Sequence, residues 1–162
     1  IAQGLRQIRD VASRIGQPEQ GAVLIARISK SLERLEAQVA LRTAPVSGLI
    51  LQKRGYAMHS GVVADLARIA GLTNAAVSLG LDNSSLIAME RIVANPPDYL
   101  IVTQDFSQPA DQGEAVLAHP ALTRLFPAGK RLTIAGQLST CAGPSTPAFI
   151  EAFSMELAQK VR

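Results

Sequence analysis

Side chains able to bind a ligand gather in three segments of the sequence. Residues 55–61 (GYAMHSG) carry an aromatic ring, a thioether, an imidazole and a hydroxyl between two glycines. Residues 104–109 add an amide and an aromatic ring, and residues 137–144 add small polar groups and the single cysteine. An apolar surface with a few polar groups is typical of a pocket for an organic molecule. The candidate ligand-binding residues are Tyr56, Met58, His59, Ser60, Gln104, Phe106, Thr140 and Cys141.

The histidines do not favour a metal site, and we predict neither a metal nor a cofactor. The chain has only 2 histidines, and His119 precedes Pro120 where it fits the start of a helix. A first-row metal needs several ligands close together, and none cluster near His59 in the sequence. We therefore expect His59 to contact an organic ligand together with Tyr56 and Met58.

Cys141 leaves one alternative open, a cysteine-dependent α/β enzyme. A catalytic thiolate needs a lowered pKa, which a helix N-terminus or a neighbouring histidine can provide. Cys141 precedes an expected helix, and His59 lies in another candidate segment. No local signature of a thiol enzyme surrounds Cys141, so we expect no enzyme activity and a small thiol at the rim of the site. As the single cysteine, it also excludes an internal disulfide and a cysteine-based zinc cluster.

Strands that alternate with helices must position these segments. The apolar runs Val46–Gln52, Tyr99–Thr103 and Arg131–Ala135 have the length and composition of buried strands. This pattern predicts the α/β class, with a mainly parallel sheet flanked by helices. Ligands bind such sheets outside the carboxyl ends of the strands, where all three candidate segments are expected to lie.

The helices are indicated by apolar residues at three- and four-residue steps. The first stretch ends at Gly16, and a second helix runs from Pro18 to about Leu41. A later helix, capped by Asn83 or Ser84, is expected to carry Leu86. The last helix begins near Pro147, and its buried face is expected to contain Phe149, Phe153 and Leu157.

Composition restricts the remaining function classes. The 162 residues, 48% hydrophobic and 18% charged, suit one compact domain. With no Trp, 2 Tyr and 4 Phe, the chain lacks the aromatic residues of a single-stranded nucleic-acid platform, and we predict no nucleic-acid partner. The net charge of +3 is scattered over helices, which indicates solvated surfaces with a weak preference for an anionic ligand.

The start of the chain carries a further indication. No apolar run approaches the roughly 18 residues of a membrane span. The sequence begins at Ile1, inside a helical pattern, and shows no signal peptide. We therefore expect a fragment or a processed product.

Four segments, in order, resemble the C-terminal lobe of helical-backbone substrate-binding proteins that serve bacterial ABC importers of siderophores, cobalamin and haem. In this family a Gly-Gly-x-Asn helix end, an Asn-Pro-Asp step, a His-Pro passage and a Gly-Pro loop follow one another. Leu72 replaces the second glycine here, and Pro97 is inserted in the Asn-Pro-Asp step. The matching segments are 65–74 (DLARIAGLTN), 87–102 (IAMERIVANPPDYLIV), 119–134 (HPALTRLFPAGKRLTI) and 141–153 (CAGPSTPAFIEAF).

The resemblance implies a domain organisation. Residues 1–41 would hold the distal part of an interlobe helix, at Ile1–Ile15, and the helix that follows it. Residues 42–162 would form the C-terminal α/β lobe of a bilobal periplasmic binding protein, whose N-terminal lobe is absent from this chain.

The resemblance also implies a function. The protein would be periplasmic or lipid-anchored outside the cytoplasm, and monomeric in its full-length form. It would bind an iron-siderophore-type metal chelate in an interlobe cleft and deliver it to a membrane permease, with cobalamin or haem as alternative ligands. Glu90 matches the glutamate that pairs with an arginine of the permease. A regulatory or assembly domain with the same fold is a further alternative.

Overall fold

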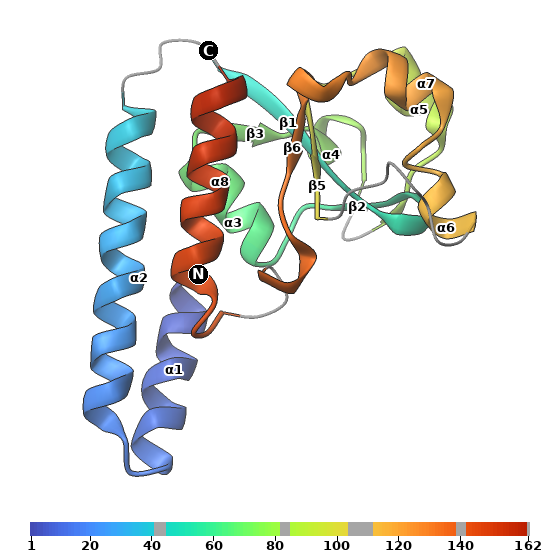
Figure 1. The fold of residues 1–162 in the computed structure, drawn as a ribbon. Helices are drawn as coiled ribbons and strands as arrows, with labels where there is room; N and C mark the ends of the chain where they lie inside the picture. Colours follow the sequence, from blue (N-terminus) through green and yellow to red (C-terminus); the bar gives the residue numbers. More distant parts are fainter. Residues whose placement is uncertain (41–44, 82–84, 104–111, 139–141, 162) are drawn as a thin grey trace.

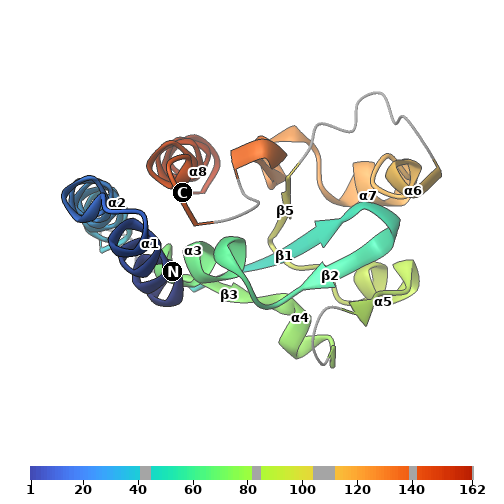
Figure 2. The same ribbon diagram turned by 90° about the horizontal axis from the view of Figure 1, so that it is seen from below.

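The chain forms a six-stranded sheet with helices on both faces (Figure 1, Figure 2). The computed structural model describes residues 1–40, 45–81, 85–103, 112–138 and 142–161. The strands are β1 (Val46–Gln52), β2 (Tyr56–Met58), β3 (Leu72–Asn74), β4 (Ser85–Leu86), β5 (Tyr99–Val102) and β6 (Arg131–Thr133). The helices are α1 (Ala2–Arg14), α2 (Pro18–Val39), α3 (Val62–Ile69), α4 (Ala75–Ser78), α5 (Met89–Ala94), α6 (Gln112–Ala115), α7 (Pro120–Leu125) and α8 (Thr146–Lys160).

The central strand of the sheet is β1. On one edge its first half pairs in parallel with β3 and its second half pairs antiparallel with β2, while β5 pairs in parallel along the other edge. Beyond these neighbours, β6 continues in parallel from β5, and β4 pairs antiparallel with β2. The prediction of an α/β fold with a mainly parallel sheet and flanking helices is confirmed.

The side chains of β1 alternate between two cores. Ile50 enters a first core formed with α2, α3 and α8, whereas Leu49 and Leu51 enter a second core formed with α4, α5 and α7. All three side chains are at most 1% exposed. This period of two places a hydrophobic layer on each face, as a sheet covered on both sides requires. The predicted stripe on the last helix, Phe149, Phe153 and Leu157, is confirmed as part of the first core.

The longest helix, α2, contributes to two different packing regions. Its middle and C-terminal parts bury Ile28 and Leu35 in the first core. Its N-terminal half packs against α1, and both extend beyond the sheet as a helical hairpin (Figure 1). The two helices approach closely because Gly21 has no side chain: a Cβ there would lie 2.4 Å from the Cβ of Ala12. Within the described residues, no helix has the combined length and apolarity needed to cross a membrane.

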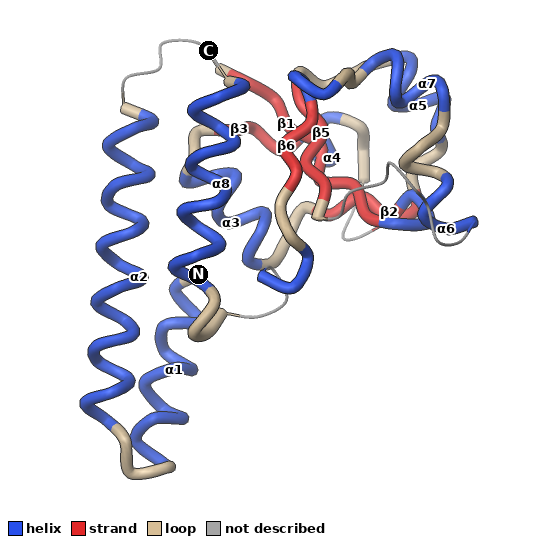
Figure 3. Tube along the Cα trace, viewed as in Figure 1, coloured by secondary structure: helices blue, strands red, loops and turns tan. Residues whose placement is uncertain are grey.

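Two expectations about local structure are wrong. Residues 55–61 were expected to form a loop, yet Tyr56–Met58 is strand β2, paired with β1 through a tight turn (Figure 3). Leu86 was expected on a helix, yet it lies in β4, and the helix α5 begins only at Met89. The backbone N–H of Ile87 donates to the carbonyl of Gly55, so pairing with β2 overrides the local helical pattern.

The outer edge of β6 is closed by two charged side chains of α8. The carboxylate of Glu156 accepts a hydrogen bond from the backbone N–H of Thr133 at 2.8 Å. The ammonium of Lys160 donates to the carbonyl of Arg131 at 2.8 Å and to Glu156 at 2.6 Å. An edge strand presents unpaired N–H and C=O groups, and this ion pair satisfies one of each.

We predict that Glu156→Ala lowers the free energy of unfolding by about 1–3 kcal/mol, because the Thr133 N–H loses its acceptor and Lys160 its counter-ion. The matched control on the same helix is Glu151→Ala, whose carboxylate is 59% exposed and lies 3.8 Å from Arg34. An exposed pair of this kind contributes about 0–1 kcal/mol. Urea unfolding followed by circular dichroism measures both variants, and equal losses would contradict the assigned role.

The amino ends of β1 and β5 are joined by a second polar contact. The backbone N–H and the hydroxyl of Ser47 donate to the carboxylate of Asp98 at 2.8 and 2.7 Å. The backbone N–H of Asp98 donates in return to the hydroxyl of Ser47 at 3.0 Å. The donation from the Ser47 backbone, then that from its hydroxyl and then the charge of Lys130, hold the pKa of Asp98 below its ordinary value of 3.8.

This contact makes the free energy of unfolding depend on pH, because it is lost when Asp98 becomes protonated. Because the folded-state pKa is lowered, the contact stabilises the fold above the unfolded value of 3.8 and is lost as the pH falls through the folded value. We predict that Asp98→Asn is less stable than the wild type near neutral pH, and that the difference shrinks below about pH 4. Urea unfolding over a pH series tests this, and a difference that persists unchanged to about pH 3 would refute it.

Candidate functional site

The carboxyl edge of the sheet ends in the β1–β2 hairpin. Its turn, Lys53–Gly55, is three residues long. Arg54 (φ 63°) and Gly55 (φ 76°) both adopt the left-handed conformation, which costs a residue with a Cβ roughly 1–2 kcal/mol. The side chains of Lys53 and Arg54 are exposed, so the hairpin presents two positive charges at this edge.

Beside the turn, three residues in register form what we call the edge strip: Gln52, Tyr56 and Leu86. Gln52 of β1 lies opposite Tyr56 of β2, and Tyr56 lies opposite Leu86 of β4. The strip shares the face of the sheet that carries Ile50 and Met58 of the first core. Unlike those core residues, Tyr56 is 42% exposed and Leu86 is 62% exposed.

The edge strip lies beside helices of the second group, since α6 packs against the turn Lys53–Gly55. In the view from below, the end of the β1–β2 hairpin lies between α5 on one side and α6 and α7 on the other, away from α1, α2 and α8 (Figure 2). The side chains of Tyr56 and Leu86 nevertheless stay exposed. An aromatic ring and an aliphatic side chain exposed next to two cations suit a molecule with a flat apolar surface and negative charge.

The four candidates of segment 55–61 do not share one environment. Tyr56 belongs to the edge strip, and Ser60 is exposed just before α3. Met58 is half-buried against the first core, and its carbonyl accepts a hydrogen bond from the amide of Asn74 at 3.1 Å. The hairpin thus brings Tyr56 to the edge of the sheet, while Met58 points toward the interior.

We predicted that His59 contacts a ligand together with Tyr56, but the two side chains lie in different surroundings. Its Nε2 atom is buried and has no hydrogen-bond partner among the described residues. His59 lines a hollow of about 610 Å³ beside β3, together with Arg68 and Asn74. In the part of the chain that the structure describes, no three His, Cys, Asp or Glu residues are grouped so as to hold a metal ion.

The other four predicted ligand contacts, Gln104, Phe106, Thr140 and Cys141, lie outside the described residues. Thr103 ends the described part after β5, and Ala142 begins it again before α8. Thr103 thus lies directly after a strand, and Ala142 lies shortly before a helix, as the alternation of strands and helices predicts.

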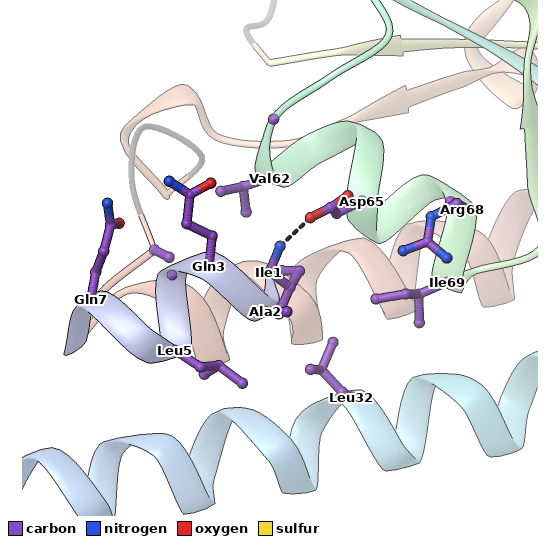
Figure 4. A pocket seen from close by; sticks show the side chains of 13 residues that line it. Ile1, Ala2, Gln3, Leu5, Gln7, Leu32, Val62, Asp65, Arg68 and Ile69 are labelled. Carbon is purple, nitrogen blue, oxygen red and sulfur yellow. Dashed lines mark hydrogen bonds and ion pairs between the residues drawn. The ribbon is translucent and has the colours of Figure 1, made fainter. Parts of the chain in front are cut away.

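A hollow of about 840 Å³ lies between α1, α2 and α3 (Figure 4). Its floor is apolar, with Leu5, Leu32 and Ile69, and the nitrogen of Ile1 contacts the carboxylate of Asp65. None of the predicted ligand residues lines it.

Glu90, the predicted docking residue, is exposed in the first turn of α5. The neighbouring Arg91 turns away from it, because its guanidinium donates to the carbonyl of Leu79 at 3.2 Å. Within the described chain, no salt bridge is formed by Glu90. Both views place α5 on the opposite side of the molecule from α2 (Figure 1, Figure 2).

Leu86, Lys53 and Arg54 are site residues that reasoning from the sequence missed. The signal for the basic turn was present, since a Gly-containing stretch of three residues between two strand-like runs is typical of a hairpin. No local signal could have found Leu86. Its strand has only two residues and exists through its pairing with β2.

The chain belongs to the periplasmic binding protein family, whose sequence model matches residues 2–135. No curated protein sequence matches the chain. The solved structures that resemble it share the fold described above.

Three of these structures illustrate the likeness. The apo form of the periplasmic heme-binding protein RhuT from Roseiflexus sp. RS-1 is 23% identical with a TM-score of 0.69, and the match covers 94% of this chain and 62% of that one. The ABC-type Fe3+-hydroxamate transport system protein from Saccharomonospora viridis is 19% identical with a TM-score of 0.73, covering 94% and 54%. A periplasmic heme-binding protein from Pseudomonas aeruginosa is 19% identical with a TM-score of 0.72, covering 97% and 59%. The chain therefore spans less than two thirds of the length of each.

Proposed function

We propose that this chain is the C-terminal part of the substrate-binding component of an ABC importer, and that it binds an iron chelate of the siderophore type at the carboxyl edge of its sheet. The observation that carries the proposal is the edge strip beside the basic turn. Tyr56 and Leu86 leave apolar surface exposed that the fold could have covered. The family and the Fe3+-hydroxamate neighbour supply the ligand class.

A second lobe, contributed by residues outside this chain, would form the opposite wall of the cleft. The lengths of the three solved neighbours support this organisation. The helix that joins the lobes is better assigned to α2 than to residues 1–15. With 22 residues, α2 is the longest of the described helices, and it buries Ile28 and Leu35 in the first core while its N-terminal part packs against α1.

Haem is the alternative ligand, and the exposed apolar surface beside the basic turn favours it. A flat macrocycle with carboxylate groups would match an apolar Tyr56–Leu86 surface next to Lys53 and Arg54. Two of the neighbours described above bind heme by their titles. No feature of the described residues favours cobalamin over these ligands, and we propose no catalytic step for Cys141.

Ligand binding by the full-length protein tests the proposal. We predict that it binds either ferrichrome, as a ferric hydroxamate, or haemin, whereas residues 1–162 alone bind at least about 10-fold more weakly because half of the contacts are missing. Tyr56→Ala and Leu86→Ala should each weaken binding by about 5- to 10-fold. Val77→Ala is the matched control, since Val77 is 68% exposed on α4 and is not part of the edge strip.

Absorbance and fluorescence titrations measure these affinities. The assignment of the edge strip would be wrong if Tyr56→Ala and Leu86→Ala bound as tightly as Val77→Ala. The transport proposal itself would be wrong if the full-length wild type bound neither haemin nor any ferric chelate.

The permease is the proposed partner, with Glu90 as the docking residue of this lobe. Ile87 is hydrogen-bonded to Gly55 of the hairpin, so the start of α5 lies close to the proposed ligand edge. A carboxylate exposed there can pair with a cation on a membrane protein outside the cytoplasm. Such a contact mainly fixes orientation and partner choice.

We predict that Glu90→Arg lowers chelate uptake by cells about 5-fold or more while leaving the affinity of the purified protein for the chelate unchanged, because reversing the charge turns attraction into repulsion. Glu33→Arg is the control, since Glu33 is exposed on α2, on the other side of the lobe. Uptake of iron-labelled ferrichrome or of haemin is the measurement. Equal uptake by the two variants would exclude Glu90 from docking.

A further inference from the structure

Gly55, the last residue of the basic turn, is the point where two other segments of the molecule meet the hairpin. Its carbonyl accepts a hydrogen bond of 3.0 Å from the backbone N–H of Ile87, directly after β4. A Cβ built on Gly55 would lie 3.6 Å from the carbonyl oxygen of Ile87 and 3.9 Å from Cγ1 of Val116. Helix α6, which ends just before Val116, packs against the same turn. The end of β4 and the end of α6 are therefore both fixed at Gly55.

The backbone conformation of Gly55 gives its carbonyl the direction that reaches Ile87. Gly55 is buried and has a φ of 76°. Glycine populates this left-handed region freely, whereas a residue with a Cβ is strained there. If φ relaxed to a negative value, the Gly55 carbonyl would rotate away from the Ile87 N–H. An added Cβ would find ordinary van der Waals distances, so the conformation requires glycine here and the available space does not.

The hydrogen bond to Gly55 supports the pairing that places Leu86 in the edge strip. Strand β4 has only two residues, and its register sets Leu86 opposite Tyr56. The Leu86 side chain is 62% exposed, so packing against the protein holds it only weakly. The next residue, Ile87, is 8% exposed and belongs to the second core. The backbone bond therefore connects the turn to that core and keeps Leu86 beside Tyr56.

We infer that Gly55 is a positioning residue of the ligand site, which holds Leu86 opposite Tyr56 and next to the two cations of the turn. This inference rests on the proposed function and deepens it. Gly55 is buried and acts on the ligand only through Leu86. Leu86 contributes to chelate affinity only while the hydrogen bond between Ile87 and Gly55 is formed.

A double-mutant cycle in the full-length protein tests this role, with ferrichrome and haemin as probes. The cycle consists of Gly55→Ala, Leu86→Ala and the variant that carries both substitutions. Gly16→Ala is the matched control, since Gly16 has a φ of 73° and a Cβ there would meet nothing within 4 Å. Gly16 lies in the turn between α1 and α2, at the end of that hairpin remote from the sheet (Figure 1). Titration gives the dissociation constant of each variant, and urea unfolding is recorded beside it.

For whichever probe the wild type binds, Gly55→Ala should weaken binding about 5- to 10-fold, and Gly16→Ala should stay within about 2-fold. Leu86→Ala should cost less than about 2-fold further when Gly55→Ala is present, but its full 5- to 10-fold or so when Gly16→Ala is present. A loss of stability alone would not remove the effect of Leu86 in this way. Additive losses in the cycle, or wild-type affinity in Gly55→Ala, would overturn the inference.

Hydrogen exchange gives a second readout that needs no substitution. A ligand that binds only the hydrogen-bonded state stabilises that state, so bound probe should slow exchange of the Ile87 amide about 10-fold or more. The amide of Gln17, which donates to the carbonyl of Ala12 at 2.7 Å in the remote turn, should keep its rate. Mass spectrometry of short peptides measures both amides, and an Ile87 rate that the probe leaves unchanged would contradict the inference.

The outcomes separate this inference from the function on which it rests. A full-length wild type that binds neither haemin nor any ferric chelate would overturn the proposed function and the inference together. Binding that depends on Leu86 and is indifferent to Gly55 would overturn the inference alone.

Discussion

The placement of β1 between two hydrophobic layers is the constraint on which the rest of the structure depends. Its central residues, Leu49, Ile50 and Leu51, are at most 1% exposed and point alternately to opposite faces. A one-residue slip would exchange the two layers, so the register of this strand is strongly specified. The register of β1 in turn fixes Gln52 as the next residue on the Ile50 face, opposite Tyr56. The edge strip thus continues the face that carries the first core to Tyr56 and Leu86, whose side chains are exposed.

Two polar contacts hold the sheet at the borders where hydrophobic packing stops. At the amino end, Ser47 and Asp98 exchange hydrogen bonds between β1 and β5. At the outer edge, Glu156 and Lys160 occupy backbone groups of β6 that have no further strand to pair with. Neither contact lies at the hairpin, where Tyr56, Leu86, Lys53 and Arg54 are exposed.

The sequence predicted the elements whose signal is local and missed those that depend on distant partners. Val46–Gln52 was predicted with its observed bounds, because seven consecutive strand-like residues after a proline are informative by themselves. The strand at Tyr56–Met58 has only three residues, and the glycines on either side of it, Gly55 and Gly61, favoured a loop. Leu86 satisfies a helical period with Met89, yet its strand is created by β2 and by the Ile87–Gly55 hydrogen bond. The prediction therefore named Tyr56 as a candidate at the carboxyl edge of the sheet, but it could not supply Leu86, which lies opposite Tyr56.

The same reasoning explains why the exposed Tyr56–Leu86 pair is informative about function. Burying a large apolar side chain contributes about 1.5–3 kcal/mol, so a fold gains by covering such a pair with a helix or loop. Here the basic turn follows instead, and Arg54 holds a left-handed conformation that costs free energy. Two unfavourable features side by side, exposed apolar surface and local backbone strain, are expected where a partner recovers the free energy on binding. A ligand with apolar surface would cover Tyr56 and Leu86, and negative charge on it would pair with Lys53 and Arg54, whereas a purely polar ligand would leave the apolar surface uncompensated.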